Sequence, residues 1–76
     1  PLYNIYPNPV DNILTIKGDD MRQVNVFNAV GQIVRCVNCN SNELILNVAD
    51  LNNGIYFINI TNDKGEMISN KVSIQH

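Results

Sequence analysis

Residues 51–60 (LNNGIYFINI) constrain the fold more than any other part of the chain. Asn52-Asn53-Gly54 is a turn sequence, because Gly reaches positive φ without a Cβ clash and Asn tolerates the left-handed region. Residues 55–60 are mostly β-branched or aromatic, which favours a strand. Both faces of this strand are mostly apolar, so we predict that it lies centrally, with one face covered and the other partly covered.

The rest of the chain divides into short alternating runs separated by turn residues. Strands are predicted over residues 3–6, 13–17, 21–28, 32–37, 43–48, 55–60 and 67–75. Between them, Gly18-Asp19-Asp20 and residues 38–42 are predicted as a turn and a loop, and Gly31 as the positive-φ residue of a hairpin. The spacing of the turns is typical of a β-sandwich, and no window keeps a helical period. We therefore predict an all-β fold, an immunoglobulin-like antiparallel β-sandwich of about seven short strands.

Composition limits the classes of function. With 76 residues, of which 45% are hydrophobic, the chain forms a single domain over residues 1–76. Its net charge of -2 comes from scattered single charges, so it has no basic patch for nucleic acid. No apolar run approaches the ~20 residues needed to cross a bilayer, and we expect no signal peptide within these residues. The abrupt start at Pro1 leads us to expect a fragment of a larger precursor.

Cys36 and Cys39 form a C-x-x-C sequence, which leaves three alternatives. A metal site lacks a second cysteine pair, since the only histidine is the terminal His76. A local disulfide requires the chain to bend, because residues three apart in a straight strand lie ~10 Å from one another. Ordinary thiols are the favoured alternative, a local disulfide is second, and metal or redox chemistry is last.

No residue pattern indicates catalysis. The carboxylates of the predicted turns suit backbone hydrogen bonding better than a calcium site; they are Asp11, Asp19, Asp20, Asp50 and Asp63. The serines have no base to activate them, and we expect His76 to be a mobile end residue or the first residue of a tag. We predict a non-enzymatic module without a cofactor or metal.

Four sequence pieces, taken in order, resemble the C-terminal sorting domain (type A) of proteins secreted by the type IX (Por) system of Bacteroidetes. They are Tyr6-Pro7-Asn8-Pro9 before residues 13–16, the hairpin of residues 24–32, Leu51-x-x-Gly54-x-Tyr56, and Gly65 before Lys71-Val72-Ser73-Ile74. Two residues depart from the family pattern: Asn28 stands where the family usually has Asp, and Gln32 where Arg is common. The candidate sorting residues are therefore Pro7, Asn8, Pro9, Gly31, Leu51, Gly54, Tyr56, Gly65, Lys71, Val72 and Ile74.

The resemblance implies a C-terminal address on a cargo domain that precedes it in the same chain. The precursor would pass through the periplasm, the outer-membrane translocon would recognise the folded domain, and a sortase-like surface peptidase would typically remove it at the cell surface. Residues 71–75 are the candidate recognition strand, because an edge strand exposes unpaired backbone groups.

A rival interpretation is an immunoglobulin-like structural or adhesive module that is retained on a surface protein. Exposed aromatic side chains would allow such a module to bind sugars, although aromatics in a small sandwich more often pack in the core. Self-association through edge strands or an unpaired cysteine is a further alternative.

Overall fold

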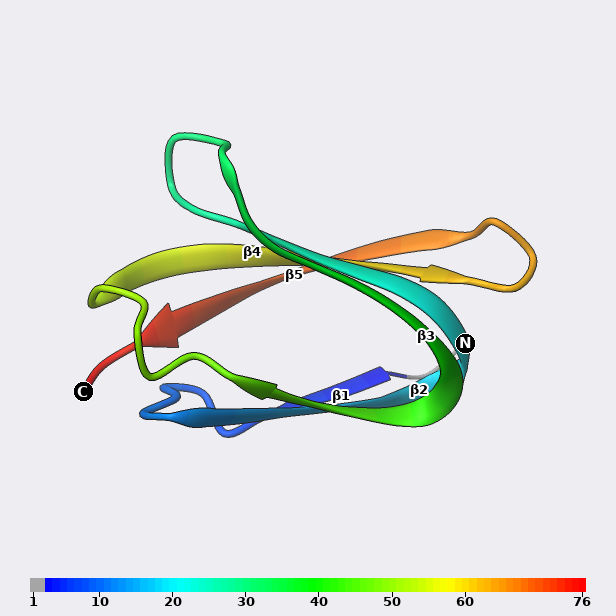
Figure 1. The fold of residues 1–76 in the computed structure, drawn as a ribbon, viewed down its shortest axis with the longest axis horizontal. Helices are drawn as coiled ribbons and strands as arrows, with labels where there is room; N and C mark the ends of the chain where they lie inside the picture. The colour runs from blue at the N-terminus through cyan, green and yellow to red at the C-terminus, as the bar shows by residue number, and fades with distance from the viewer. Residues whose placement is uncertain (1–2) are drawn as a thin grey trace.

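The computed structural model describes residues 3–76 and contains five antiparallel strands (Figure 1). The strands are β1 (Tyr3–Tyr6), β2 (Ile13–Phe27), β3 (Ile33–Asn47), β4 (Gly54–Asn62) and β5 (Met67–Ile74). In this described part, no helix is long and apolar enough to cross a bilayer. The prediction of an all-β antiparallel fold is confirmed.

All five strands belong to one sheet that curls over on itself. The strand order is β1-β2-β4-β5, with β3 paired to β2. Residues 13–17 of β2 lie between β1 and the second half of β3, whereas residues 21–27 lie between β4 and the first half of β3. Figure 1 shows the result: β2 and β3 turn back together at one end of the molecule, so that β1 faces the layer of β4 and β5.

The predicted number of seven strands was wrong, because β2 and β3 each join two predicted strands. The turn predicted at residues 18–20 and the loop predicted at residues 38–42 are bends within continuous strands. Register shifts accompany these bends, and a bulge bends a strand without ending its pairing. Asp20 takes a positive φ of 54°, and its N–H donates to Oδ1 of Asn42 in the neighbouring bend at 2.9 Å.

Gly18 marks the point where β1 lies against the bend of β2. A Cβ at this position would fall 1.8 Å from Cδ1 of Tyr3, so the tyrosine ring occupies the space of a side chain. Tyr3 is also the register partner of Gly18. The glycine therefore serves the close approach of an aromatic ring.

The core lies between the two layers and contains side chains from four of the strands. Its buried members are Val10, Leu14, Ile16, Met21, Val24, Val26, Leu46, Val48, Tyr56, Ile58, Ile60, Val72 and Ile74. The alternating runs place residues 14 and 16, 24 and 26, and 72 and 74 in this core. The predicted central position of β4 is confirmed, and its outward Ile55 and Phe57 remain 41% and 39% exposed.

Candidate functional site

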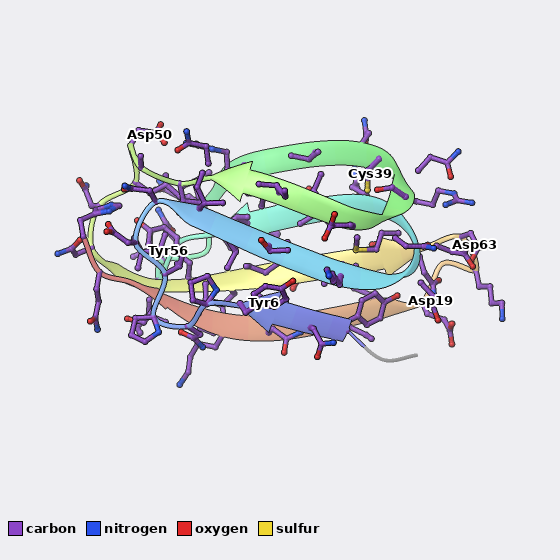
Figure 2. The ribbon with its side chains drawn as sticks, turned by 90° about the horizontal axis from the view of Figure 1, so that it is seen from below. Tyr6, Asp19, Cys39, Asp50, Tyr56 and Asp63 are labelled. Carbon is purple, nitrogen blue, oxygen red and sulfur yellow. The ribbon has the colours of Figure 1, made fainter. Side chains whose placement is uncertain are left out.

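Most of the candidate sorting residues meet at one end of the curled sheet. Residues 7–10, residues 51–56 and residues 71–76 all reach this end, which Figure 1 shows on the side of the C-terminus. The hairpin that contains Gly31 lies beside it, because residues 28–30 and 53–56 line the same hollow. Gly65 lies away from this group, in the β4–β5 hairpin at the opposite end, where Figure 2 also places Asp63. We call the shared end the motif end.

Asn8 and Val10 cover the C-terminal part of the free edge of β5. The Asn8 side chain donates through Nδ2 to the Lys71 carbonyl at 3.4 Å and accepts the Ser73 N–H at Oδ1 at 3.0 Å. Val10 N–H donates to the Ser73 carbonyl at 2.8 Å, and the Val10 carbonyl accepts the Gln75 N–H at 2.9 Å. The expectation that residues 71–75 expose unpaired backbone groups was therefore wrong: the chain's own N-terminal segment pairs with them.

The two prolines explain why a side chain performs this pairing. Pro7 and Pro9 have no backbone N–H, so the residues on either side of Asn8 cannot donate to a neighbouring strand. A primary carboxamide carries both a donor and an acceptor, as a peptide group does. Asn8 thus supplies from its side chain the donor and the acceptor that a strand residue would supply from its backbone.

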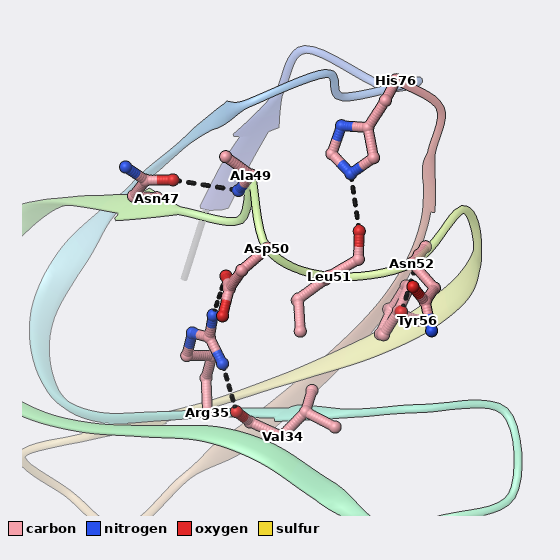
Figure 3. A network of polar contacts seen from close by, with 9 residues as sticks. All are labelled: Val34, Arg35, Asn47, Ala49, Asp50, Leu51, Asn52, Tyr56 and His76. Carbon is pink, nitrogen blue, oxygen red and sulfur yellow. Dashed lines mark hydrogen bonds and ion pairs between the residues drawn. The ribbon is translucent and has the colours of Figure 1, made fainter.

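The Leu51-x-x-Gly54-x-Tyr56 motif closes the turn that leads into β4 (Figure 3). Tyr56 is buried, and its hydroxyl donates to the Asn52 carbonyl at 2.7 Å. Leu51 packs partly buried against the core, and its N–H donates to the Val48 carbonyl at 3.0 Å. Tyr56 therefore fastens the turn from which its own strand begins.

We expect Gly54→Val to destabilise the domain by ~1–3 kcal/mol, more than changes at the other turn residues. Gly54 has a φ of 155°, which L residues rarely adopt, and it is the register partner of Ile74. A β-branched residue would be strained there. The matched control is Ile55→Val, one residue further along β4, which should change the free energy of unfolding by less than ~0.5 kcal/mol. Thermal unfolding measures both, and an unchanged melting temperature in Gly54→Val would contradict the turn assignment.

His76 is held in place by three contacts, contrary to the expectation of a mobile end residue. Its N–H donates to Asn53 Oδ1 at 3.0 Å, Nε2 lies 2.6 Å from the Leu51 carbonyl, and Nδ1 lies 3.2 Å from Asp11 Oδ1. The Leu51 carbonyl and then the Asp11 carboxylate raise the pKa of His76 above its ordinary 6.5. Both partners accept, so the doubly protonated ring satisfies both contacts.

This pKa shift predicts a pH-dependent contribution to stability. Because the folded-state pKa of His76 is raised, its contribution is complete below pH 6.5 and is lost as the pH rises through the folded-state value. We expect the melting-temperature advantage of the natural chain over His76→Gln to be largest near pH 5.5 and to shrink toward pH 8. Asp11→Asn should remove part of the same pH-dependent advantage. An advantage that stays constant from pH 5.5 to 8 would contradict the assigned contacts.

An ion pair joins β3 to the segment that precedes the Leu51 turn. The Arg35 guanidinium donates to the Asp50 carboxylate and also to the Val34 carbonyl, as Figure 3 shows. The guanidinium lowers the pKa of Asp50. The Asp50 carboxylate is exposed, so the ion pair adds little to the free energy of unfolding. Its main effect is to position this segment.

The two hairpin turns share one hydrogen-bond pattern, which our reading of the sequence had missed. In the first, Asn28 Oδ1 accepts from the Val30 and Gln32 N–H groups at 3.1 and 2.9 Å, and Nδ2 donates to Gln32 Oε1 at 2.9 Å. In the second, Asn62 makes the same contacts with Lys64 N–H, Glu66 N–H and Glu66 Oε1. The repeated spacing Asn-x-x-Gly-Gln/Glu is the signal that predicts this equivalence.

The glycines of these two turns both adopt positive φ. Gly31 and Gly65 have φ values of 87° and 79°, so the prediction of positive φ at Gly31 is confirmed. At the first turn, the Asn28–Gln32 amide contact occupies the positions where the resemblance places an Asp and an Arg. The departure from the family pattern therefore keeps a side-chain link across the hairpin but removes its charge.

The two cysteines lie on opposite faces of β3. Cys36 is exposed, whereas Cys39 packs partly buried against the core, and both are free thiols. Alternation along the strand separates their side chains, so a local disulfide does not form. Among residues 3–76, no group of three or more His, Cys, Asp or Glu side chains could hold a metal ion.

The outer face of the sheet carries a cross-strand aromatic pair. Phe27 of β2 lies opposite Phe57 of β4, and both line a shallow hollow with Asn28, Asn59 and Ser69. Tyr56 lies in the core and is therefore no part of an exposed aromatic surface.

The fold and the site thus define a class of protein. It is a small all-β domain in which hydrogen bonds link three motif segments at one end. The family model of the secretion system C-terminal sorting domain matches residues 4–75, so the chain belongs to this family. The resemblance to type IX sorting domains is thereby confirmed.

The fold is also found in a solved structure of PorZ, described as an essential bacterial surface component of the type IX secretion system of Porphyromonas gingivalis. That match has a TM-score of 0.82 at 18% sequence identity, and it covers 97% of this chain but 11% of the PorZ chain. Among curated protein sequences, none matches significantly.

Proposed function

We propose that this domain is the C-terminal address by which the type IX outer-membrane translocon selects its cargo. The observation that carries the proposal is the family match over residues 4–75, because it covers all five strands and the motif end except for the single residues Tyr3 and His76. The module performs no catalysis of its own. Its partners are the translocon and a sortase-like surface peptidase, and its route leads through the periplasm to the cell surface.

The position of the two ends supports this role. β1 begins at the end of the molecule opposite the motif end, so a cargo domain in cis would be attached away from the motif residues (Figure 1). An address that folds on its own presents the same surface whatever cargo precedes it. We take residues 1–76 as one such domain of a larger precursor. We also take the curled sheet as a variant of the immunoglobulin-like sandwich, in which β2 and β3 run through both layers.

The motif residues support recognition of a folded domain rather than of an extended peptide. Val72 and Ile74 lie in the core, and Asn8 and Gly54 shape the motif end, so only a folded chain assembles them. Lys71 remains exposed on β5 and is the one charged residue among the candidate sorting residues, so we take it as a contact for a partner.

Peptide mapping of the mature surface protein separates this function from a retained structural or adhesive module. We expect peptides from the cargo and none from residues 13–76 in the surface fraction, with the domain still present in the periplasmic precursor. A surface protein that keeps the domain at full occupancy would favour the retained module.

A further inference from the structure

The turn into β4 contains a sequence that is prone to a reaction with water. Asparagine is a thermolabile residue, and Asn53 is the one asparagine of the chain that is followed by glycine. The backbone nitrogen of the following residue attacks Cγ of the asparagine side chain, and glycine hinders this attack least because it has no Cβ. Asn53 and Gly54 are both exposed, so water reaches the turn.

The reaction is a deamidation in two steps, with water as its co-reactant. The Gly54 nitrogen gives up its proton and bonds to Asn53 Cγ, the Cγ–Nδ2 bond breaks, and ammonia leaves a five-membered succinimide ring. Water then opens the ring. Breaking the bond from the nitrogen to Cγ gives aspartate, and breaking its bond to the main-chain carbonyl carbon gives isoaspartate, in which the backbone passes through the side chain and gains a methylene group.

Strand pairing engages the attacking nitrogen of Gly54. The backbone groups of Ser73 point away from β4, since they bond to residues 8 and 10. By alternation, those of Ile74 point toward β4, where Gly54 is its register partner. The Gly54 N–H therefore faces β5, and pairing with Ile74 opposes the loss of its proton.

A second contact holds the side chain that would be attacked. Asn53 Oδ1 accepts the His76 N–H at 3.0 Å, and the His76 ring is itself held by Leu51 and Asp11. Ring closure requires the carboxamide to rotate until Cγ meets the Gly54 nitrogen, and the contact with His76 resists this rotation. Both contacts belong to the motif end, so both are lost when the chain unfolds.

We propose that Asn53-Gly54 is a hydrolytic modification site of the unfolded chain, and that folding of the motif end closes it through Ile74 and His76. Deamidation before folding is then a one-way loss. Isoaspartate adds a methylene group to the backbone of the turn that Tyr56 fastens by its hydrogen bond to the Asn52 carbonyl (Figure 3). This inference does not depend on the sorting function, and it is tested on the purified chain.

Peptide mass spectrometry measures the reaction, because a carboxyl group is heavier than the amide it replaces. The natural chain is incubated at pH 8 and 37 °C, once folded and once in guanidinium chloride. We expect Asn53 to react ~10-fold or more faster in the unfolded sample, since reaction in the folded sample requires the motif end to open. Asn52 is the internal control, because it lies in the same turn but precedes asparagine, and it should stay intact in both samples. Equal rates for Asn53 in the two samples, or equal loss of Asn52 and Asn53 in the unfolded one, would overturn the proposal.

Two variants test the closure in the folded chain. A chain that ends at Gln75 lacks the N–H that binds Asn53 and should deamidate several-fold faster than the natural chain under folding conditions. His76→Ala keeps this backbone N–H and should stay close to the natural rate. A chain ending at Gln75 that reacts no faster than the natural chain would overturn the proposed closure.

Refolding tests the consequence for the turn. The isoaspartyl fraction of the unfolded sample is separated by chromatography and returned to folding conditions. We expect it not to regain the melting temperature of the natural chain. Asn53→Asp carries the new charge without the extra methylene group and should refold. An isoaspartyl chain with the natural melting temperature would overturn the proposed loss.

Discussion

A chain that ends at Asn70 should leave its cargo in the periplasm, with surface delivery reduced to background. The truncation removes Val72 and Ile74, which are 3% and 1% exposed and are the register partners of Tyr56 and Gly54. It also removes the groups to which residues 7–10 bond, so the motif end loses one of its three segments and the hydrogen bonds that hold a second. Fractionation of a reporter fusion into periplasmic and surface pools measures the effect, and normal surface delivery would contradict the role of this strand.

The variant Lys71→Ala distinguishes two causes of the truncation defect, namely loss of the fold and loss of a contact with the translocon. This side chain is exposed on β5, and its removal keeps Val72 and Ile74 as well as the Lys71 carbonyl to which Asn8 donates. A truncation defect with normal delivery of Lys71→Ala assigns the defect to loss of the fold. A defect in both, with an unchanged melting temperature in Lys71→Ala, assigns part of it to contact with the translocon.

Ile58→Ala should destabilise the domain by ~2–5 kcal/mol, because it opens a cavity at the centre of the core. Ile58 is fully buried on β4, the strand that lies between β2 and β5. The net stability of a domain this small is only ~3–5 kcal/mol, so a large fraction of the variant should be unfolded at 37 °C. The free energy of unfolding in urea measures the effect.

The control for this variant is Ile33→Ala, the same substitution at a side chain that is 57% exposed on β3. We expect it to change the free energy of unfolding by less than ~0.5 kcal/mol. Equal effects at the two positions would contradict the placement of the core.

Local patterns predicted those parts of the fold that depend on neighbouring residues. Alternation predicted a strand through Val24 and Val26, which the structure buries in the core, and turn chemistry placed Gly31 at positive φ. The strand number could not be predicted in this way. Whether residues 18–20 end a strand or bend it depends on pairing with β3 and on the ring of Tyr3, and neither is visible in the local sequence.

The motif end could be predicted only in part for the same reason. The resemblance selected Asn8, Lys71 and Tyr56, but the bond from Asn8 to Ser73 joins residues 65 positions apart in the chain. The sequence therefore indicated an open edge where the structure has a covered one. It also offered a signal that was missed, the Asn-x-x-Gly spacing shared by the turns at Asn28 and Asn62.

Most of the motif residues have structural roles, which explains why a family pattern can be spread over the whole chain. Gly54 and Tyr56 form the turn into β4, Val72 and Ile74 fill the core, and Asn8 covers the edge. The motif residues thus build the folded surface that a translocon would recognise. We therefore expect substitutions at these positions to impair folding and sorting together.

Surface delivery of an inert periplasmic reporter fused to residues 1–76, with a short native linker upstream, tests the central claim most directly. The fusion is compared in a Bacteroidetes host with and without a working type IX translocon. We predict that the reporter reaches the surface only with the translocon and loses the mass of the domain there. A reporter that stays in the periplasm of the competent host, with the domain intact and folded, would contradict the claim.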